Sequence, residues 1–262
     1  MKLSFEIKYP ITKEFLTSGT KRRSGIKMSK VGFIVAHDTG NDGSTALQNI
    51  TYYENSKNDM SASAHIFVDD TGIYECIPFL TDTPEKAWHV QYQKTMDNHL
   101  FGDDANDIAG GVELCYSYKR GRINNEESYK RYVWVLAYIC YKFGLNPAKT
   151  VVGHHVLDPQ RKTDPQNALS KMGRSYDQLL QDIVTEYYDC LSKEDVLMQL
   201  KEWQIELAND AIDRLYKKKL IVNAEDWKKK LIENPQDILQ DMPWLFFVML
   251  DRLSENNDRG VK

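Results

Sequence analysis

The spacing of apolar residues divides the chain into a first part with strands and helices and a second part with helices alone. In the first part, short apolar runs alternate with segments in which apolar residues recur at helical spacing. This alternation favours an α/β domain, which we expect to end near residue 191. The expected strands cover 32–37, 64–68, 73–77, 110–116 and 151–153, and the expected helices cover 45–55, 127–143 and 176–191.

Turn-forming residues between these segments predict where they begin and end. Ser44 is expected to cap the helix that follows it, and Gly144 to end the helix before it. The four residues 69–72, which read Asp-Asp-Thr-Gly, predict a hairpin between two strands. Residues 79–109 show no regular spacing, so we expect a long surface loop there, and such loops are often functional.

The second part, residues 192–262, shows only helical spacing and predicts a small all-α domain. Its last expected helix begins after Pro243 and contains the apolar run Trp244–Leu250. So apolar a helix either fills a small core or forms a partner-binding face. Self-association into a homo-oligomer through this face is the slightly preferred interpretation, because a small helical piece gains stability by burying so apolar a helix against a copy. Light scattering of the full chain would test it.

Composition and charge exclude several classes of protein. The net charge is -4, which gives no broad basic field for nucleic acid. No run approaches the roughly 18 apolar residues that cross a membrane, so no membrane insertion is expected. Because charges interrupt the apolar residues of the N-terminal segment, we expect no signal peptide and synthesis in the cytoplasm. A protein of this kind would need another agent to release it before it acted outside the membrane.

The four cysteines are far apart and form no CxxC pair. This spacing predicts buried free thiols rather than disulfides or a cysteine-rich zinc site. They are Cys76, Cys115, Cys140 and Cys190.

Two short segments carry residues suited to binding a metal ion. His37 ends an apolar run, and His154 and Asp164 lie together in a later segment, 153–165. Two imidazoles and a carboxylate, with a fourth position left to water, is a common ligand set for catalytic zinc. Each residue also has an ordinary interpretation, since a histidine that ends a strand is usually a core or edge residue and Asp-Pro is a common turn.

Glu113 and Lys162 are candidates for catalysis beside such a metal. Strand alternation would let Glu113 face a cleft while its two neighbours face the core, in a position to act as general base. Lys162, two residues before Asp164, could stabilise a developing oxyanion. The ordinary alternatives are a strand carboxylate that faces solvent and a solvated loop charge.

Three further residues are candidates for contact with a substrate. His65 begins an apolar run and could line the cleft or simply satisfy the sheet. Trp88 and His89 lie in the expected loop and could contact a ligand, although a loop tryptophan often packs back on its own domain. His99 and His155 are expected to be structural or solvated. His155 follows His154 directly, and adjacent strand residues point to opposite faces.

Taken together, these segments resemble the zinc-dependent N-acetylmuramoyl-L-alanine amidases of the type 2, peptidoglycan-recognition-protein-like family. That family includes many phage endolysins and prophage-encoded autolysins. The resemblance covers roughly residues 30 to 170 and keeps the family order. The matching segments are 35–39, 64–70, 87–89, 111–114 and 153–165.

The resemblance implies a central mixed β-sheet flanked by helices, with the catalytic domain in residues 1–191. It implies that His37, His154 and Asp164 bind one zinc ion and that Glu113 and Lys162 are catalytic. The implied reaction is hydrolysis of the amide between N-acetylmuramic acid and L-alanine in bacterial peptidoglycan, which lyses the cell wall. Residues 192–262 resemble helical modules that follow the amidase domain in some phage lysins, so cell-wall binding stays open beside self-association, and sedimentation with cell walls would distinguish the two.

The chain departs from the family pattern at two positions, and two other functions stay open. Ala64 stands where many members have an aromatic residue, often Tyr, so help from that hydroxyl would be absent. Gln166 stands where many have Gly. The alternatives are a peptidoglycan-recognition module without catalysis and a zinc hydrolase of another amide. Non-catalytic members lose a zinc ligand, whereas this chain keeps three candidates.

Overall fold

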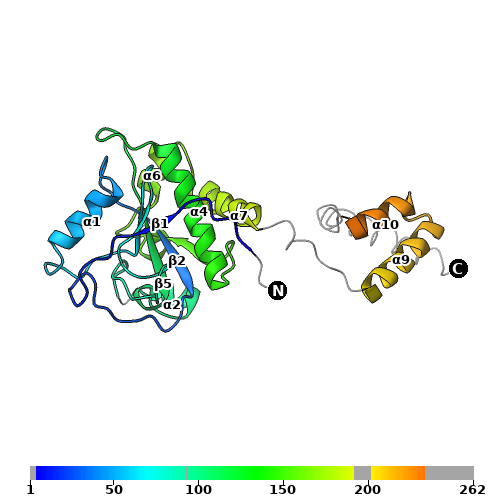
Figure 1. Cartoon of the computed structure of the whole chain (residues 1–262), viewed down its shortest axis with the longest axis horizontal. Helices are drawn as coiled ribbons and strands as arrows, with labels where there is room; N and C mark the ends of the chain where they lie inside the picture. The colour runs from blue at the N-terminus through cyan, green and yellow to red at the C-terminus, as the bar shows by residue number, and fades with distance from the viewer. Residues whose placement is uncertain (1–3, 93, 192–201, 234–262) are drawn as a thin grey trace. The chain divides into compact units, whose positions relative to one another are not determined.

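The computed structural model describes residues 4–92, 94–191 and 202–233 (Figure 1). The chain divides into two compact units, one of which is Phe5–Cys190 and the other Met1–Ser4 with Leu191–Lys262. In the second unit, helix α9 (Glu202–Lys217) contacts helix α10 (Ala224–Glu233). The expected helix at Trp244–Leu250 lies outside the described residues. The role predicted for this second unit stays a prediction.

The first unit is built on a mixed six-stranded sheet, which confirms the expected fold class. The strand order is β1-β4-β3-β5-β2-β6. Only β3 and β4 pair antiparallel, and they form the hairpin expected around residues 69–72. The strands are β1 (Ile11–Lys13), β2 (Phe33–Asp38), β3 (Ile66–Val68), β4 (Ile73–Glu75), β5 (Ala109–Leu114) and β6 (Val151–Gly153). The edge strand β1 was not expected, because its three residues are not buried and show no apolar pattern.

Helices cover both faces of this sheet. Helix α4 packs on β3, β4 and β5, and α7 packs on α4 (Figure 1). As expected, α4 ends at Gly144, which has a left-handed φ of 67° that glycine adopts without strain. The helices are α1 (Ala46–Asn55), α2 (Thr95–Phe101), α3 (Ala105–Ile108), α4 (Asn125–Phe143), α5 (His154–Leu157), α6 (Gln166–Lys171) and α7 (Tyr176–Cys190). No helix among the described residues is both long and apolar enough to cross a membrane.

Two expectations about local structure were wrong. The cap of α1 is Thr45 rather than Ser44, because the Thr45 hydroxyl accepts from the backbone N–H of Gln48 in a capping box. Residues 79–109 are not a surface loop, since they contain α2 and α3. Polar side chains there bond to the backbone inside the fold, and Asp97, for example, accepts from the N–H of Ala105 at 2.9 Å. Because these polar residues are common in loops, the sequence did not indicate that much of the segment is buried.

Strand alternation places the candidate residues on one face of the sheet. His37 on β2 pairs in register with Glu113 on β5, so both side chains point to the same side. Val112 and Leu114, the neighbours of Glu113, are fully buried on the opposite side, as expected. From that opposite side, the hydroxyl of Tyr132 on α4 donates to the carbonyl of His37 at 2.9 Å. The helix therefore supports the sheet directly behind the site.

Substitution of Tyr132 by phenylalanine should destabilise the first unit by about 1 kcal/mol, the typical net value of one buried hydrogen bond. Tyr132 is fully buried and its hydroxyl also lies 3.3 Å from the carbonyl of Val112. The measurement is the urea midpoint of Tyr132→Phe, with Tyr188→Phe as the matched control because Tyr188 is 61% exposed. Equal midpoints for the two variants would show that the Tyr132 hydroxyl contributes nothing.

Candidate metal centre and catalytic cavity

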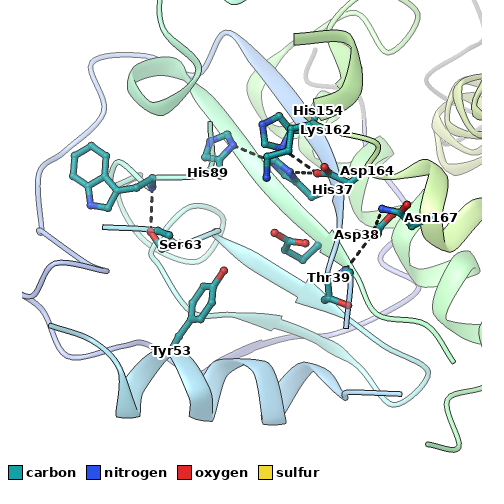
Figure 2. A pocket seen from close by; sticks show the side chains of 14 residues that line it. His37, Asp38, Thr39, Tyr53, Ser63, His89, His154, Lys162, Asp164 and Asn167 are labelled. Carbon is teal, nitrogen blue, oxygen red and sulfur yellow. Dashed lines mark hydrogen bonds and ion pairs between the residues drawn. The ribbon is translucent and has the colours of Figure 1, made fainter. Parts of the chain in front are cut away.

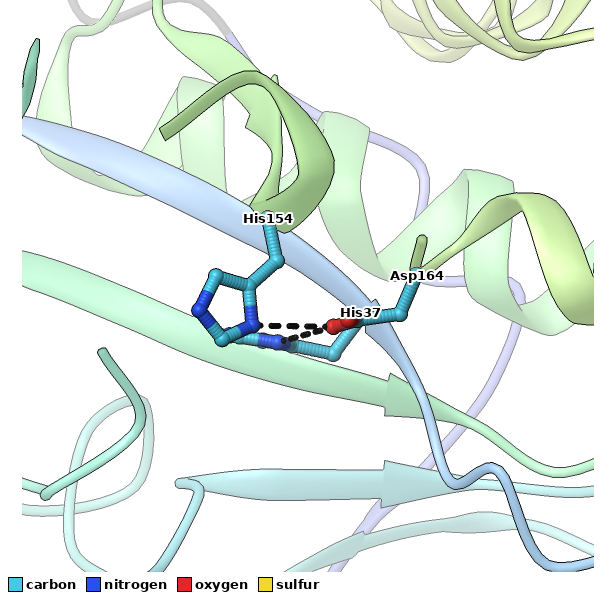
Figure 3. A group of neighbouring side chains, drawn as sticks. All are labelled: His37, His154 and Asp164. Atoms are coloured by element: carbon cyan, nitrogen blue, oxygen red, sulfur yellow. Dashed lines mark hydrogen bonds and ion pairs between the residues drawn. The ribbon is translucent and has the colours of Figure 1, made fainter. Parts of the chain in front are cut away.

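The three candidate metal ligands meet at the carboxyl ends of two neighbouring parallel strands. His37 lies at the end of β2, and Gly153, the last residue of β6, pairs with Ala36. The next residue, His154, begins α5 and therefore lies beside His37. The Asp164 carboxylate oxygen Oδ2 lies 2.8 Å from His37 Nδ1 and 3.0 Å from His154 Nδ1 (Figure 3).

This group has the composition and spacing of a metal site. All three side chains are buried, and their candidate ligand atoms lie within 4.8 Å of one another. Ligand atoms bound tetrahedrally to one zinc ion at about 2.0–2.2 Å lie about 3.3 Å apart, so a small outward shift of the side chains would admit the ion. The Nε2 atom of His154 is buried and has no hydrogen-bond partner among the described residues. Burial lowers the pKa of His37 to about 4, which keeps its imidazole in the neutral form that binds metals.

Ion pairs and backbone bonds hold the loop that carries Asp164. Asp158, near its start, is buried and binds Lys94 at 2.8 Å and Arg161 at 2.7 Å. The carbonyl of Asp164 accepts from the N–H of His155 at 3.0 Å. His155 lies on α5 and not on a strand, which corrects the basis on which its orientation was predicted. These contacts fix the position of the candidate ligand Asp164 within the fold.

Asp38 holds the other side of the same loop. Its carboxylate accepts from the backbone N–H of Ala168 at 3.1 Å and from the Asn167 amide at 3.2 Å. Both donors belong to α6, which begins two residues after Asp164. Strand β2 therefore carries one candidate ligand, His37, and positions another, Asp164, through the next residue along the strand, Asp38.

A cavity of about 280 Å³ opens beside the three ligands (Figure 2). Glu113 lines it and has one carboxylate oxygen, Oε2, buried without a hydrogen-bond partner among the described residues. Burial raises the pKa of Glu113 well above its usual value, and the nearby carboxylates of Asp164 and Asp38 raise it further. Residues that line the cavity are His37, Asp38, Thr39, Gly40, Tyr53, Ala62, Ser63, Trp88, His89, Glu113, His154, Lys162, Asp164 and Asn167.

Lys162 also faces this cavity, as Figure 2 shows. In the described part of the chain its ammonium group has no ion-pair partner, unlike Lys94, which binds Asp158. An unpaired cation beside a metal-binding group can stabilise negative charge that develops on a bound molecule.

The residues expected to contact substrate fall into two groups. Trp88 and His89 line the cavity, and Ser63 fixes Trp88 by accepting from its backbone N–H at 3.1 Å. His65 does not line it, because its Nδ1 accepts from Gly111 N–H at 2.9 Å and its Nε2 donates to the Glu85 carbonyl at 2.8 Å. Both ring nitrogens of His65 are therefore used inside the fold, and this geometry gives no support to a substrate contact.

Among the polar groups of the cavity that the sequence patterns missed is the phenol of Tyr53. Tyr53 lies on α1, and its ring packs against Phe67 with centroids 5.2 Å apart and lies under the guanidinium of Arg22 at 4.2 Å. Burial raises the pKa of Tyr53 well above its usual value, so the hydroxyl keeps its proton and can donate. The neighbouring Tyr52 is 56% exposed, and only the rotation of the helix decides which of the two faces the cavity.

Comparison with known proteins identifies the family. The sequence profile of a family described as N-acetylmuramoyl-L-alanine amidase matches residues 27–167. That is more than half of the chain and contains every candidate site residue. The chain belongs to this family, as its motifs indicated.

Two relatives named as N-acetylmuramoyl-L-alanine amidases match about half of the chain. The chain is 31% identical over 149 residues to the N-acetylmuramoyl-L-alanine amidase BlyA of Bacillus subtilis (strain 168), which covers 55% of this chain and 39% of the relative. It is 33% identical over 135 residues to a probable N-acetylmuramoyl-L-alanine amidase of Bacillus licheniformis, which covers 51% and 36%. The chain thus spans less than half the length of these relatives.

Solved structures share the fold. The Staphylococcus aureus hydrolase AmiA, solved in complex with its ligand, matches with a TM-score of 0.53 and 26% identity over 69% of this chain and 85% of that one. The catalytic domain of XlyA matches with a TM-score of 0.52 and 23% identity over 66% and 99%. Both likenesses cover about the length of the α/β unit.

Substitution of Glu113 by glutamine should stabilise the metal-free protein increasingly as pH rises. A carboxyl whose folded pKa is raised binds its proton more tightly in the folded state, so its stabilising contribution is lost as pH rises from the unfolded value of 4.5 towards the folded pKa. The difference in unfolding free energy between Glu113→Gln and the parent should be near zero at pH 4. Above that it should grow by up to about 1.4 kcal/mol per pH unit. A constant difference between pH 4 and 8 would show that the pKa of Glu113 is ordinary.

Proposed function

We propose that this protein is a zinc-dependent peptidoglycan hydrolase that cleaves the amide bond between N-acetylmuramic acid and the L-alanine of the stem peptide. The observation that carries the proposal is the convergence of the His37, His154 and Asp164 group with Glu113 and Lys162 on one cavity. Its site of action would be the bacterial cell wall, and its partner the peptidoglycan itself.

Zinc held by His37, His154 and Asp164 would polarise the scissile carbonyl and lower the pKa of a water molecule. Glu113 takes the proton of the attacking water and delivers it to the nitrogen of the leaving L-alanine, so that the amine departs neutral. Lys162 stabilises the negative charge that develops on the carbonyl oxygen. Both residues face the cavity, where a substrate amide can reach them.

The charges around Glu113 suit this role only when a cation is present. Without one, burial and the charge of Asp164 raise the pKa of Glu113 and favour its protonated form, which cannot act as a base. A divalent cation held by Asp164 would offset that negative charge and favour ionised Glu113. Metal binding would then also activate Glu113 as a base.

Loss of His37 should abolish metal binding. We expect the parent to retain one zinc ion per chain after dialysis, and His37→Ala to retain none, because two ligands hold zinc too weakly. His99→Ala is the matched control, since His99 lies on the exposed surface of α2, and it should keep its zinc. Stoichiometric zinc in His37→Ala would reject the ligand assignment.

Substitution of Glu113 or Lys162 should separate catalysis from metal binding. Glu113→Gln should keep its zinc and lose about 10²–10⁴-fold in turnover of purified peptidoglycan, the usual contribution of a general base. Lys162→Ala should act in the same direction. Lys149→Ala, an exposed lysine that precedes β6 at the opposite edge of the sheet, is the matched control and should leave turnover unchanged. If Glu113→Gln turned over peptidoglycan at the parent rate, Glu113 would have no role as a general base.

The chemical ends released from purified peptidoglycan distinguish the alternatives. New free amino groups on L-alanine, with no new reducing sugars, are the products expected of this amidase. Binding to peptidoglycan without any new end group would instead indicate a recognition module. Zinc retention without peptidoglycan products would indicate a hydrolase of a different amide.

A further inference from the structure

His89 bonds to a metal ligand on one side and to the backbone on the other. Its Nδ1 lies 3.1 Å from Nε2 of His37, and its Nε2 lies 3.0 Å from the carbonyl oxygen of Ala109. The rings of His89 and His37 meet nearly edge to face, with an interplanar angle of 89°. His89 is 9% exposed, so the protein rather than solvent determines these contacts.

Only one assignment of hydrogen-bond donors and acceptors fits the contacts that join His37, His89 and Ala109. A carbonyl oxygen can only accept, so Nε2 of His89 must donate to Ala109. The other nitrogen of the neutral, buried ring, Nδ1, then carries a lone pair, and this lone pair faces Nε2 of His37 at 3.1 Å. That lone pair accepts the Nε2 proton of His37. The remaining nitrogen of His37, Nδ1, then carries a lone pair that points at Asp164.

We propose that His89 is a positioning residue that fixes the tautomer and orientation of His37, so that its Nδ1 is the metal-binding atom. This inference rests on the proposed metal site and adds a residue to it. His89 was expected to contact substrate, and the geometry gives it this different role. An outer hydrogen bond of this kind both orients an imidazole ligand and increases its basicity.

The same order of donors explains why the site needs a cation. Nδ1 of His37 and Oδ2 of Asp164 lie 2.8 Å apart. When the single ring proton of a neutral His37 lies on Nε2 and is donated to His89, Nδ1 of His37 and Oδ2 of Asp164 are both acceptors and repel each other. A positive charge bound between them removes the repulsion. We call the two hydrogen bonds that join the Ala109 carbonyl, His89 and His37 the relay. The relay therefore favours metal binding between His37 and Asp164.

The backbone of β5 leaves room for the ring of His89. A Cβ atom at Gly111 would lie 2.7 Å from Cγ and 2.9 Å from Nδ1 of His89, closer than real contacts allow. Gly111 is thus required by the His89 ring and not by its own backbone, which belongs to a regular strand. This gives a second way to disturb the relay without any change to a metal ligand.

Zinc affinity of the metal-free protein, measured by competition with a chelator, tests the inference. His89→Phe keeps a ring but removes both hydrogen bonds, and we expect it to weaken zinc binding by about 10–100-fold. His89→Gln should restore most of the affinity, because its amide can accept from His37 and donate to Ala109. His99→Ala is the control, since it also removes an imidazole but lies on the exposed surface of α2, away from His37 and His89. Its affinity per folded molecule should stay within about threefold of the parent.

Two further readouts separate positioning from a general loss of structure. Gly111→Ala should weaken zinc binding in the parent but add nothing in a His89→Ala background, where the obstructing ring is absent. In nitrogen-15 spectra of the zinc-loaded parent, His37 should show a slowly exchanging Nε2 proton, and His89→Phe should lose that signal.

Parent-like zinc affinity in His89→Phe would overturn the inference, as would protonation of His37 at Nδ1 in the loaded protein. Additive effects of Gly111→Ala and His89→Ala would also overturn it. If the parent itself bound no zinc through His37, the proposed function would fail instead, so the two failures can be told apart.

Discussion

The site depends on the parallel pairing of β2 with its two neighbours, β5 and β6. Because parallel strands end at the same edge of a sheet, this pairing brings together residues that lie far apart in the sequence. The register of β2 with β5 sets His37 opposite Glu113, and the register with β6 sets His154 beside His37. A slip of one residue would turn Glu113 to the other face, into the packing beneath α4.

A loop beyond the sheet positions the third candidate ligand, Asp164. Asp164 lies beyond the sheet, and its position is fixed by Asp38 on one side and by the ion pairs of Asp158 on the other. Cationic side chains neutralise the buried Asp158, whereas Lys162 in the same loop stays free to face the cavity. Some charges near this segment thus stabilise the fold, whereas the charge of Lys162 faces the cavity.

Apolar periodicity predicted an α/β domain and its main helices, whereas the mixed sheet and the residues that converge on the cavity were predicted from short motifs and the family resemblance that these motifs carry. Sequence reasoning failed for residues 79–109, where buried polar side chains such as Asp97 support α2 and α3 and imitate a solvent-facing loop. It also missed Tyr53, since no pattern in the sequence decides whether Tyr52 or Tyr53 faces the cavity. The hydrogen bonds of His65 and His89 depend on ring orientation in three dimensions, which spacing along the chain does not encode.

The close approach of Gly111 to His89 has a consequence for protein design. A scaffold that received only the two histidines and the aspartate would contain the ligand atoms without the neighbour that orients one of them. The smallest transplantable unit also contains His89, the Ala109 carbonyl and a strand residue without a side chain at the position of Gly111. That requirement excludes most host sheets, in which a β-branched residue would occupy the place of the imidazole ring.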